Sequence, residues 1–180
     1  ESLVINFRRL DQSSNWHHIQ CYVIEFNPEE VAVQQGSFDI TSSTTDTITL
    51  PTAISGTNEK AAMTFGWRTS SDARYHSPVM VRGRVLSDGT QIDFYRDNTN
   101  GQCDGHWFLF EDKGNNFRVV HKNFDFGSGG QTEIIYDDRS TVDLMRTFLL
   151  GSFASSCPNE GYQSRGTTRM FIYSNGSIRA

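Results

Sequence analysis

Val23-Ile24-Glu25-Phe26 occurs a second time, 86 residues later, as Leu109-Phe110-Glu111-Asp112. The match continues without a gap, because Gly36-Ser37-Phe38-Asp39-Ile40 returns as Lys122-Asn123-Phe124-Asp125-Phe126. An internal repeat outranks local signals when a fold is predicted. We therefore expect two copies of one unit of roughly 90 residues.

Each copy is expected to consist of β-strands. Short segments rich in Val, Ile, Thr and aromatic residues are separated by Gly, Ser, Asn, Asp and Pro, a pattern typical of a sandwich or barrel. Helical periodicity is limited to one short turn at 140–145. The first copy has six strand-like segments, at 31–40, 46–50, 61–69, 79–86, 90–96 and 106–111. The second copy has counterparts at 117–126, 132–136, 147–155, 168–173 and 177–180. Ser87-Asp88-Gly89 and Asn175-Gly176 occupy equivalent places and predict tight hairpins, since glycine adopts positive φ readily.

The second copy reaches Ala180 before its last two strands are complete, and residues 3–9 and 16–26 have the character of those strands. We therefore predict an all-β fold of two tandem antiparallel β-sandwich units, which form a circularly permuted duplication. The first unit spans 27–112, and the second spans 113–180 and is completed by 1–26. Without that completion, backbone groups along an open sheet edge would remain unpaired.

The N-terminal strands can complete the second unit in two ways. Closure within the chain is favoured, because a tethered strand has a high effective concentration. Insertion into a neighbouring molecule is the alternative, and it would produce an oligomer or a head-to-tail fibre.

The sixth strand carries apolar residues at positions of both parities, in Cys21-Tyr22-Val23-Ile24 as in Trp107-Phe108-Leu109-Phe110. A half-exposed strand would alternate, so this strand is expected to pack on both faces. We assign subunit or inter-unit contacts to Cys21, Val23, Trp107 and Leu109. A central strand covered by a loop explains the pattern equally well. Glu25 and Glu111 fit rim positions at the strand end.

Composition excludes several classes of function. The chain has 36% hydrophobic and 21% charged residues, and its net charge of −5, without clusters of Lys or Arg, argues against nucleic-acid binding. No apolar run approaches the ~20 residues that cross a bilayer. The chain begins at Glu1 rather than Met, which fits either a secreted protein whose signal peptide has been removed or a chain that was expressed from this residue.

The three cysteines, Cys21, Cys103 and Cys157, allow at most one intrachain disulfide. Cys103 and Cys157 lie in loop-like surroundings and are the favoured pair, whereas Cys21 lies within a strand and fits a core position. Neither a CxxC motif nor Cys/His metal-ligand spacing occurs, so no metal or cofactor is expected.

The strand order of the first copy is similar to that of a known family. Gly36-Ser37-Phe38 is followed by Thr47-Ile48-Thr49-Leu50-Pro51, then by 61–68, 79–86 and 91–96, and last by His106-Trp107-Phe108. This order resembles the six-stranded antiparallel β-sandwich of H-type lectin domains and of related tandem modules in phage tail and bacterial surface proteins. The resemblance implies binding of sugars such as N-acetylgalactosamine at the subunit boundaries of trimers or hexamers. It assigns no ligand residues, because no distinctive sugar-binding tripeptide aligns.

One loop has the composition of a carbohydrate site, which needs an aromatic face for C–H groups and polar side chains for hydroxyls. It is the longest polar connection of the first unit, where function tends to lie. The candidate ligand residues in it are Trp67, Arg68, Asp72, Arg74, Tyr75 and His76. Trp67 also continues the parity of Met63 and Phe65, which favours a core position instead.

We find no catalytic motif: the sequence contains no nucleophile elbow, no HExxH and no phosphate-binding loop. We therefore expect a non-enzymatic structural or adhesive subunit of an extracellular or virion appendage, which assembles with itself as an oligomer or fibre. The alternative is a carbohydrate-binding, lectin-like module that recognises a cell-surface glycan.

Overall fold

The computed structural model describes residues 23–69, 80–97, 99, 101–121 and 150–152, together with the backbone of three short strands at 135–136, 171–172 and 178–179. Apart from one 3₁₀ turn, η1 (Asn58–Lys60), every regular element in these residues is a strand. The described part of the chain is therefore all-β, as the sequence predicts. It also contains no helix with the length and hydropathy that a bilayer crossing requires.

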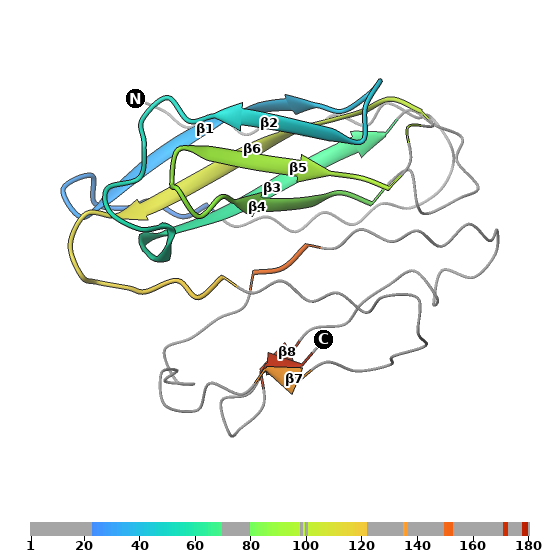
Figure 1. The fold of residues 1–180 in the computed structure, drawn as a ribbon. Coiled ribbons are helices and arrows are strands. Elements are labelled where there is room, and N and C mark those ends of the chain that lie inside the picture. Colours follow the sequence, from blue (N-terminus) through green and yellow to red (C-terminus); the bar gives the residue numbers. More distant parts are fainter. Residues whose placement is uncertain are drawn as a thin grey trace.

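Six of the described strands form two three-stranded antiparallel sheets between Val31 and Asp112 (Figure 1). The first sheet has the order β1-β6-β3, with β1 (Val31–Asp39), β6 (Cys103–Asp112) and β3 (Ala61–Thr69). The second has the order β2-β5-β4, with β2 (Thr45–Thr49), β5 (Gln91–Tyr95) and β4 (Arg82–Val85). The six predicted strands of the first copy are confirmed, with small shifts at their ends.

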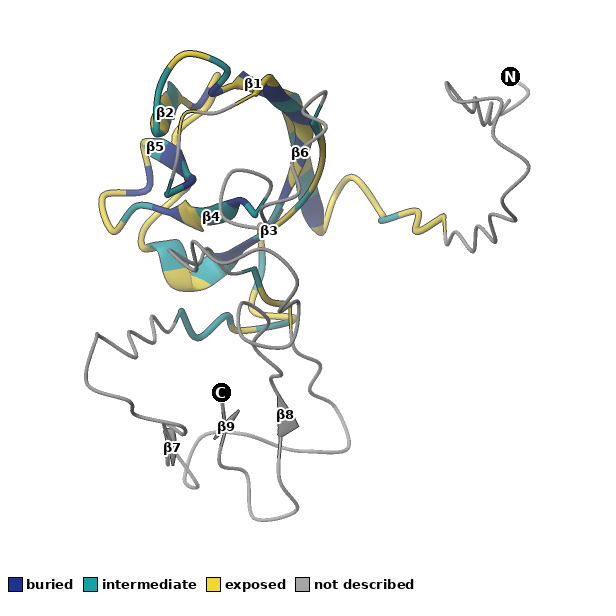
Figure 2. Ribbon diagram, turned by 90° about the vertical axis from the view of Figure 1, so that its right-hand side faces the viewer, coloured by how far each residue is buried: buried dark blue, intermediate teal, exposed yellow. Residues whose placement is uncertain are grey.

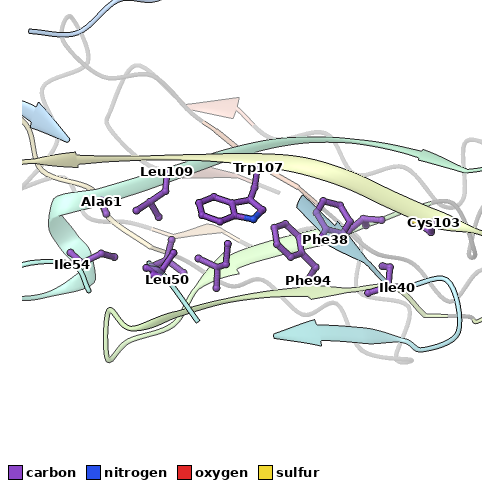
Figure 3. Packing of buried hydrophobic residues seen from close by; sticks show 12 residues of the cluster. Phe38, Ile40, Leu50, Ile54, Ala61, Phe94, Cys103, Trp107 and Leu109 are labelled. Atoms are coloured by element: carbon purple, nitrogen blue, oxygen red, sulfur yellow. The ribbon is translucent and has the colours of Figure 1, made fainter. Parts of the chain in front are cut away.

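The two sheets face each other across one apolar core. Figure 2 shows the arrangement of the two sheets in a view along the strands. Phe38 of β1 stacks on Phe94 of β5 with ring centroids 3.9 Å apart, and Phe65 of β3 meets both rings edge-on. Trp107 lies between the sheets beside Phe38 and Phe94 (Figure 3). Burying one such side chain contributes roughly 1.5–3 kcal/mol, so the aromatic centre stabilises the contact between the sheets.

The position opposite Trp107 on β1 is glycine. Gly36 is its register partner, and a Cβ atom there would lie 2.7 Å from Cζ2 of the Trp107 ring. Only a residue without a side chain leaves room for the indole at this point, so the Gly-Ser-Phe sequence of β1 is explained by core packing.

The direction of the β6 side chains corrects one prediction. Trp107 and Leu109 point into the core of their own sandwich and are fully or almost fully buried. They therefore face neither another subunit nor the other unit, in contrast to the subunit or inter-unit contacts predicted for them. Both parities of β6 are apolar, and the sequence alone does not reveal which of them faces inward. The apolar residues of the outward parity are Phe108 and Phe110.

The N-terminal part of the prediction is also corrected where the structure describes it. Residues 23–26, expected at the end of a strand, lie in no strand, and Val23 is 61% exposed. A strand needs a neighbour for its backbone groups, and no pairing partner for this stretch is found among the described residues. Cys21 and the predicted strands at 3–9 and 16–22 lie outside them.

The hairpin between β4 and β5 is confirmed. Gly89 has a φ of +66°, its N–H donates to the Leu86 carbonyl at 3.0 Å, and Leu86 N–H donates to the Gln91 carbonyl at 3.0 Å. The positive φ explains why glycine occupies this position.

Three short strands are described in the second copy. They form a sheet of order β7-β9-β8, with β7 (Ile135–Tyr136), β9 (Ile178–Arg179) and β8 (Phe171–Ile172), and both pairings are antiparallel. Each lies inside a predicted strand. By contrast, residues 117–121 and 150–152, which belong to two further predicted strands, are in no strand. The turn Asn175-Gly176 and the predicted helical turn at 140–145 lie outside the described residues.

Candidate interaction surface

The outer face of the β1-β6-β3 sheet is the surface of that sheet turned away from the core. Asp104, His106, Phe108 and Phe110 of β6 point to it, because they alternate with the buried residues of the strand. Their register partners extend the face to both sides, with Arg68 beside Asp104 and Val33 beside Phe110. The outer face therefore has a polar end at Asp104 and an apolar end at Phe110.

The polar end forms an open groove of about 510 Å³. Its lining consists of Ser37, Phe38, Asp39, Asp46, Arg68, Gln102, Asp104, Gly105 and His106. Arg68 Nε donates to both carboxylate oxygens of Asp104, at 2.9 and 3.2 Å, and Gln102 Nε2 donates to Asp104 Oδ1 at 3.3 Å. Since the Arg68 side chain is largely exposed, this ion pair shapes the groove more than it stabilises the fold.

Two carboxylates form the wall opposite Arg68. The backbone N–H of Asp39 donates to Asp46 Oδ2 at 3.0 Å, and Asp39 Oδ1 accepts from the Thr41 N–H at 2.8 Å. The hydrogen bonds from the Thr41 side chain and backbone lower the pKa of Asp39, so this carboxylate stays ionised at neutral pH. The groove is thus acidic and accepts hydrogen bonds. Within the described residues, no group of three or more His, Cys, Asp or Glu side chains is arranged to hold a metal ion.

Arg96 fixes the loops at this end of the sandwich. Its guanidinium is fully buried and donates to the carbonyls of Thr41 (2.8 Å), Ser43 (3.2 Å), Thr99 (3.2 Å) and Gly101 (2.8 Å). A buried charge is tolerated when its donors are satisfied in this way. Because the loops that carry these carbonyls lead to Asp46 and Gln102, Arg96 determines the shape of the groove without lining it.

The apolar end of the outer face contains a cluster of three phenylalanines. Phe110 of β6 stacks on Phe26 with ring centroids 5.6 Å apart, and its other contact is an edge-on approach of Phe117 at 6.1 Å. Phe108 is 45% exposed, and Val33 is also exposed. Apolar side chains of this size, next to one another on a sheet face, favour an interaction surface.

The end of β6 also contains two buried carboxylates. Glu111 Oε1 accepts from the N–H of Ser55 at 2.7 Å and from its hydroxyl at 2.5 Å. The rim position expected for Glu111 is therefore wrong, because this side chain is buried and ties the loop before η1 to the sheet. Asp112 accepts from the N–H groups of Gly114, Asn116 and Phe117 and so fixes the turn after the strand.

The predicted ligand residues are only partly described. Trp67 is 42% exposed and contacts Phe65 with ring centroids 5.6 Å apart, so it lies at the edge of the core with part of its ring exposed to solvent. Arg68 points to the groove. The remaining candidates, Asp72, Arg74, Tyr75 and His76, lie outside the described residues. The structure therefore places two of the six predicted residues, Trp67 and Arg68, on neighbouring positions of β3.

Cys103 carries a free, buried thiol, and burial raises its pKa. The predicted disulfide from Cys103 to Cys157 is thus not formed in the structure, and Cys157 itself lies outside the described residues. Cys103 is a small core residue at the start of β6.

Sequence reasoning missed Asp39, Asp46 and Asp104 as groove residues and Arg96 as the residue behind them. For Asp39 a signal existed, because it recurs as Asp125 in the repeat. For Asp104 and Arg96 the sequence contains no such signal, because their roles at the groove depend on which loops the fold brings together.

No family model, curated protein or solved structure matches the chain.

Proposed function

We propose that the protein is a non-enzymatic structural or adhesive subunit that assembles with itself as an oligomer or fibre, in an extracellular or virion appendage. We name residues 23–26 the arm, and the observation that carries this proposal is the exposure of its first three residues. Val23 is 61% and Ile24 is 72% exposed, although Leu109, the counterpart of Val23 in β6, is fully buried. Adjacent exposed apolar residues with strand-forming character are the usual means by which one chain adds to another.

The duplicated sandwich is part of the proposal, and the short sheet of the second copy supports it. Shifted back by 87 residues, the offset between the two hairpin motifs, β7, β9 and β8 fall within β2, β5 and β4. The strand order β7-β9-β8 then corresponds to β2-β5-β4, with antiparallel pairing throughout. Repeated units of this kind present the same kinds of surface twice, which favours regular assembly.

The mass of the full chain in solution tests the proposal. We expect the wild-type protein to have a mass above the 20.4 kDa of one chain by sedimentation equilibrium. Val23→Asp with Ile24→Asp should reduce the mass to one chain, because charges on the arm oppose its burial in a partner. The control is Ser42→Asp with Thr49→Asp, two exposed polar positions outside the arm, and it should keep the wild-type mass. A wild-type chain that remains at one-chain mass at every concentration contradicts the proposal.

A carbohydrate-binding function, which the resemblance to H-type lectin domains implies, is the second candidate. It is favoured by two separate observations, the exposed part of the Trp67 ring at the edge of the core and the position of Arg68 in the lining of the groove. Aromatic faces bind the C–H surface of sugars, while carboxylates and guanidinium groups bind hydroxyls. The six-stranded sandwich of the first unit is compatible with this candidate.

Binding to a glycan array separates the two candidates. Lectin function predicts glycan signals that Trp67→Ala and Tyr75→Ala abolish. Phe108→Ala, an exposed aromatic residue nearer the apolar end of the same outer face, is the matched control and should leave the signals unchanged. Assembly without any glycan signal in the wild type would eliminate the lectin candidate.

A further inference from the structure

The pairing of β1 with β6 follows one register that extends beyond the two strands. In every pair, from Val31 with Asp112 to Asp39 with Asp104, the two residue numbers add up to 143. The next hydrogen bond, from the Lys113 N–H to the Glu30 carbonyl at 2.8 Å, obeys the same rule. Continued further, the register pairs the arm with residues 117–120, which we name the acceptor stretch.

The sequence repeat gives the same correspondence. The arm repeats residues 109–112 of β6, and the acceptor stretch repeats residues 31–34 of β1, both at the offset of 86. The arm should therefore add to the acceptor stretch as β6 adds to β1.

The side chains that this register brings together are complementary. It pairs Val23 with Val120 and Ile24 with Val119, which are apolar on both sides. It also pairs Glu25 with Arg118, which carry opposite charges, and Phe26 with Phe117. Apolar, aromatic and opposite-charge cross-strand pairs all stabilise antiparallel pairing.

Within one chain this pairing is not made, although Phe26 and Phe117 contact the same Phe110 ring. The linker between the arm and β1 is closed into a turn, since the Asn27 carbonyl accepts from the N–H groups of Glu30 and Val31 at 3.0 and 2.9 Å. Lys113 Nζ fixes the same turn by donating to the Pro28 carbonyl at 2.6 Å. The arm therefore turns away from the direction in which the register would continue.

The acceptor stretch is fixed to the first unit at the same time. Val119 N–H donates to the Glu59 carbonyl at 2.7 Å, and the Nε2 atom of the neighbouring His121 lies 2.7 Å from the Asn58 carbonyl oxygen. An acceptor held in place and an arm held away from it by a short linker are the conditions under which a strand is exchanged between copies.

We infer that the arm of one copy adds to the acceptor stretch of a second copy as an antiparallel strand, with Ile24 opposite Val119. This inference rests on the proposed function and names its partner, a second copy of the same chain. Reciprocal exchange closes a dimer, whereas one-way exchange continues into a fibre.

Disulfide trapping between separate chains tests the inference. Two variants, Ile24→Cys and Val119→Cys, are made in the full chain with Cys21→Ser and Cys157→Ser, and the buried Cys103 is kept. Mixed and oxidised, they should form a dimer in which mass spectrometry finds the 24–119 link, which in this mixture can form only between copies. The control replaces Ile24→Cys by Glu25→Cys, whose side chain points to the opposite face of a paired strand, and the link to 119 should be lost.

The possible outcomes separate the inference from the proposed function. A chain that carries both Ile24→Cys and Val119→Cys and links only within itself, while the mixture gives no dimer, overturns exchange between copies. If the wild-type chain is an oligomer but the mixed cysteine variants yield no 24–119 link, the inference is overturned, and assembly through the outer face is the remaining explanation. A wild-type chain at one-chain mass overturns the proposed function itself.

Discussion

Residues 23–26 and 109–112 have similar sequence patterns, but two of their equivalent positions lie in opposite environments. Leu109 is fully buried and Glu111 is buried, whereas their counterparts Val23 and Glu25 are exposed. The difference lies in the neighbours, because β6 has β1 on one side and β3 on the other. A strand-like sequence pattern thus indicates only a preference for β-structure, and a strand forms only where neighbouring strands pair with it.

The two stretches also differ at their last position, where Asp112 corresponds to Phe26. Asp112 accepts hydrogen bonds from the turn after β6, while Phe26 packs its ring on Phe110. The turn after the arm is instead fixed by Asn27, whose backbone carbonyl and side-chain oxygen both accept hydrogen bonds. The turn after the arm and the turn after β6 occupy equivalent places in the repeat, but different hydrogen bonds stabilise them.

The largest expected effect compares Leu109 with Val23. Leu109→Ala should lower the free energy of unfolding by about 2–5 kcal/mol, because it opens a cavity in a fully buried site. Val23→Ala should change it by less than about 0.5 kcal/mol at concentrations where the chain is monomeric. Urea unfolding monitored by tryptophan fluorescence measures both values. An equal loss of unfolding free energy in the two variants would contradict the difference in burial between Leu109 and Val23.

The next effect compares the two glutamates. Glu111→Ala leaves the Ser55 N–H without its acceptor and should cost about 1–3 kcal/mol of unfolding free energy. Glu25→Ala should be close to neutral in the monomer, because its side chain is exposed. Glu111→Gln, which keeps an acceptor oxygen, should recover part of the loss in the same urea experiment. A Gln variant as unstable as the Ala variant would argue against this hydrogen bond.

A smaller effect tests how the arm is attached to β6. A double-mutant cycle of Phe26→Ala and Phe110→Ala should give a coupling of about 0.5–1.5 kcal/mol, the usual range for an aromatic pair. Phe26→Ala combined with Trp67→Ala, which is several residues away along the sheet, should be additive. Additivity in both cycles would mean that the stacked pair does not hold the arm in solution.

The last prediction concerns the contribution of Asp112 to stability, which is expected to depend on pH. Burial raises the pKa of this carboxyl, but the hydrogen bonds from Phe117, Gly114 and Asn116 outweigh it, and the pKa lies below its usual value. A lowered pKa means that the carboxylate stabilises the fold at neutral pH, and that this stability is lost as the pH falls below about 4. Asp112→Asn should therefore be less stable at pH 7 and lose less stability on acidification. Parallel pH profiles of thermal unfolding for the two proteins would rule out this role.

Much of the first unit could be predicted from its sequence. Its six strands follow from alternating apolar residues bounded by turn residues, and the hairpin follows from the glycine at position 89. These are local signals. The inward face of β6 could not be predicted, because Trp107 and Phe108 are both aromatic and only the packing against β5 distinguishes them.

The candidate surfaces were harder to predict than the fold. The groove is lined by Asp39 and Arg68, which flank Asp104 from two different strands. No local sequence pattern predicts the register that places them there. The role of Arg96 depends on carbonyl groups from two separate loops. The repeat predicts that the arm can form a strand. Its exposure, however, follows from the closed turn at Asn27, which the repeat does not predict.

The adjacency of Val31 and Asp112 has a mechanical consequence. The chain enters and leaves the sandwich of β1–β6 at neighbouring positions of two antiparallel strands, so tension along the polypeptide pulls β1 and β6 apart at one end. The ladder bonds of antiparallel strands lie perpendicular to the strands, and such a load breaks them one after another rather than all together. Under stretching, this sandwich should therefore open like a zipper at low force and act as an extensible element.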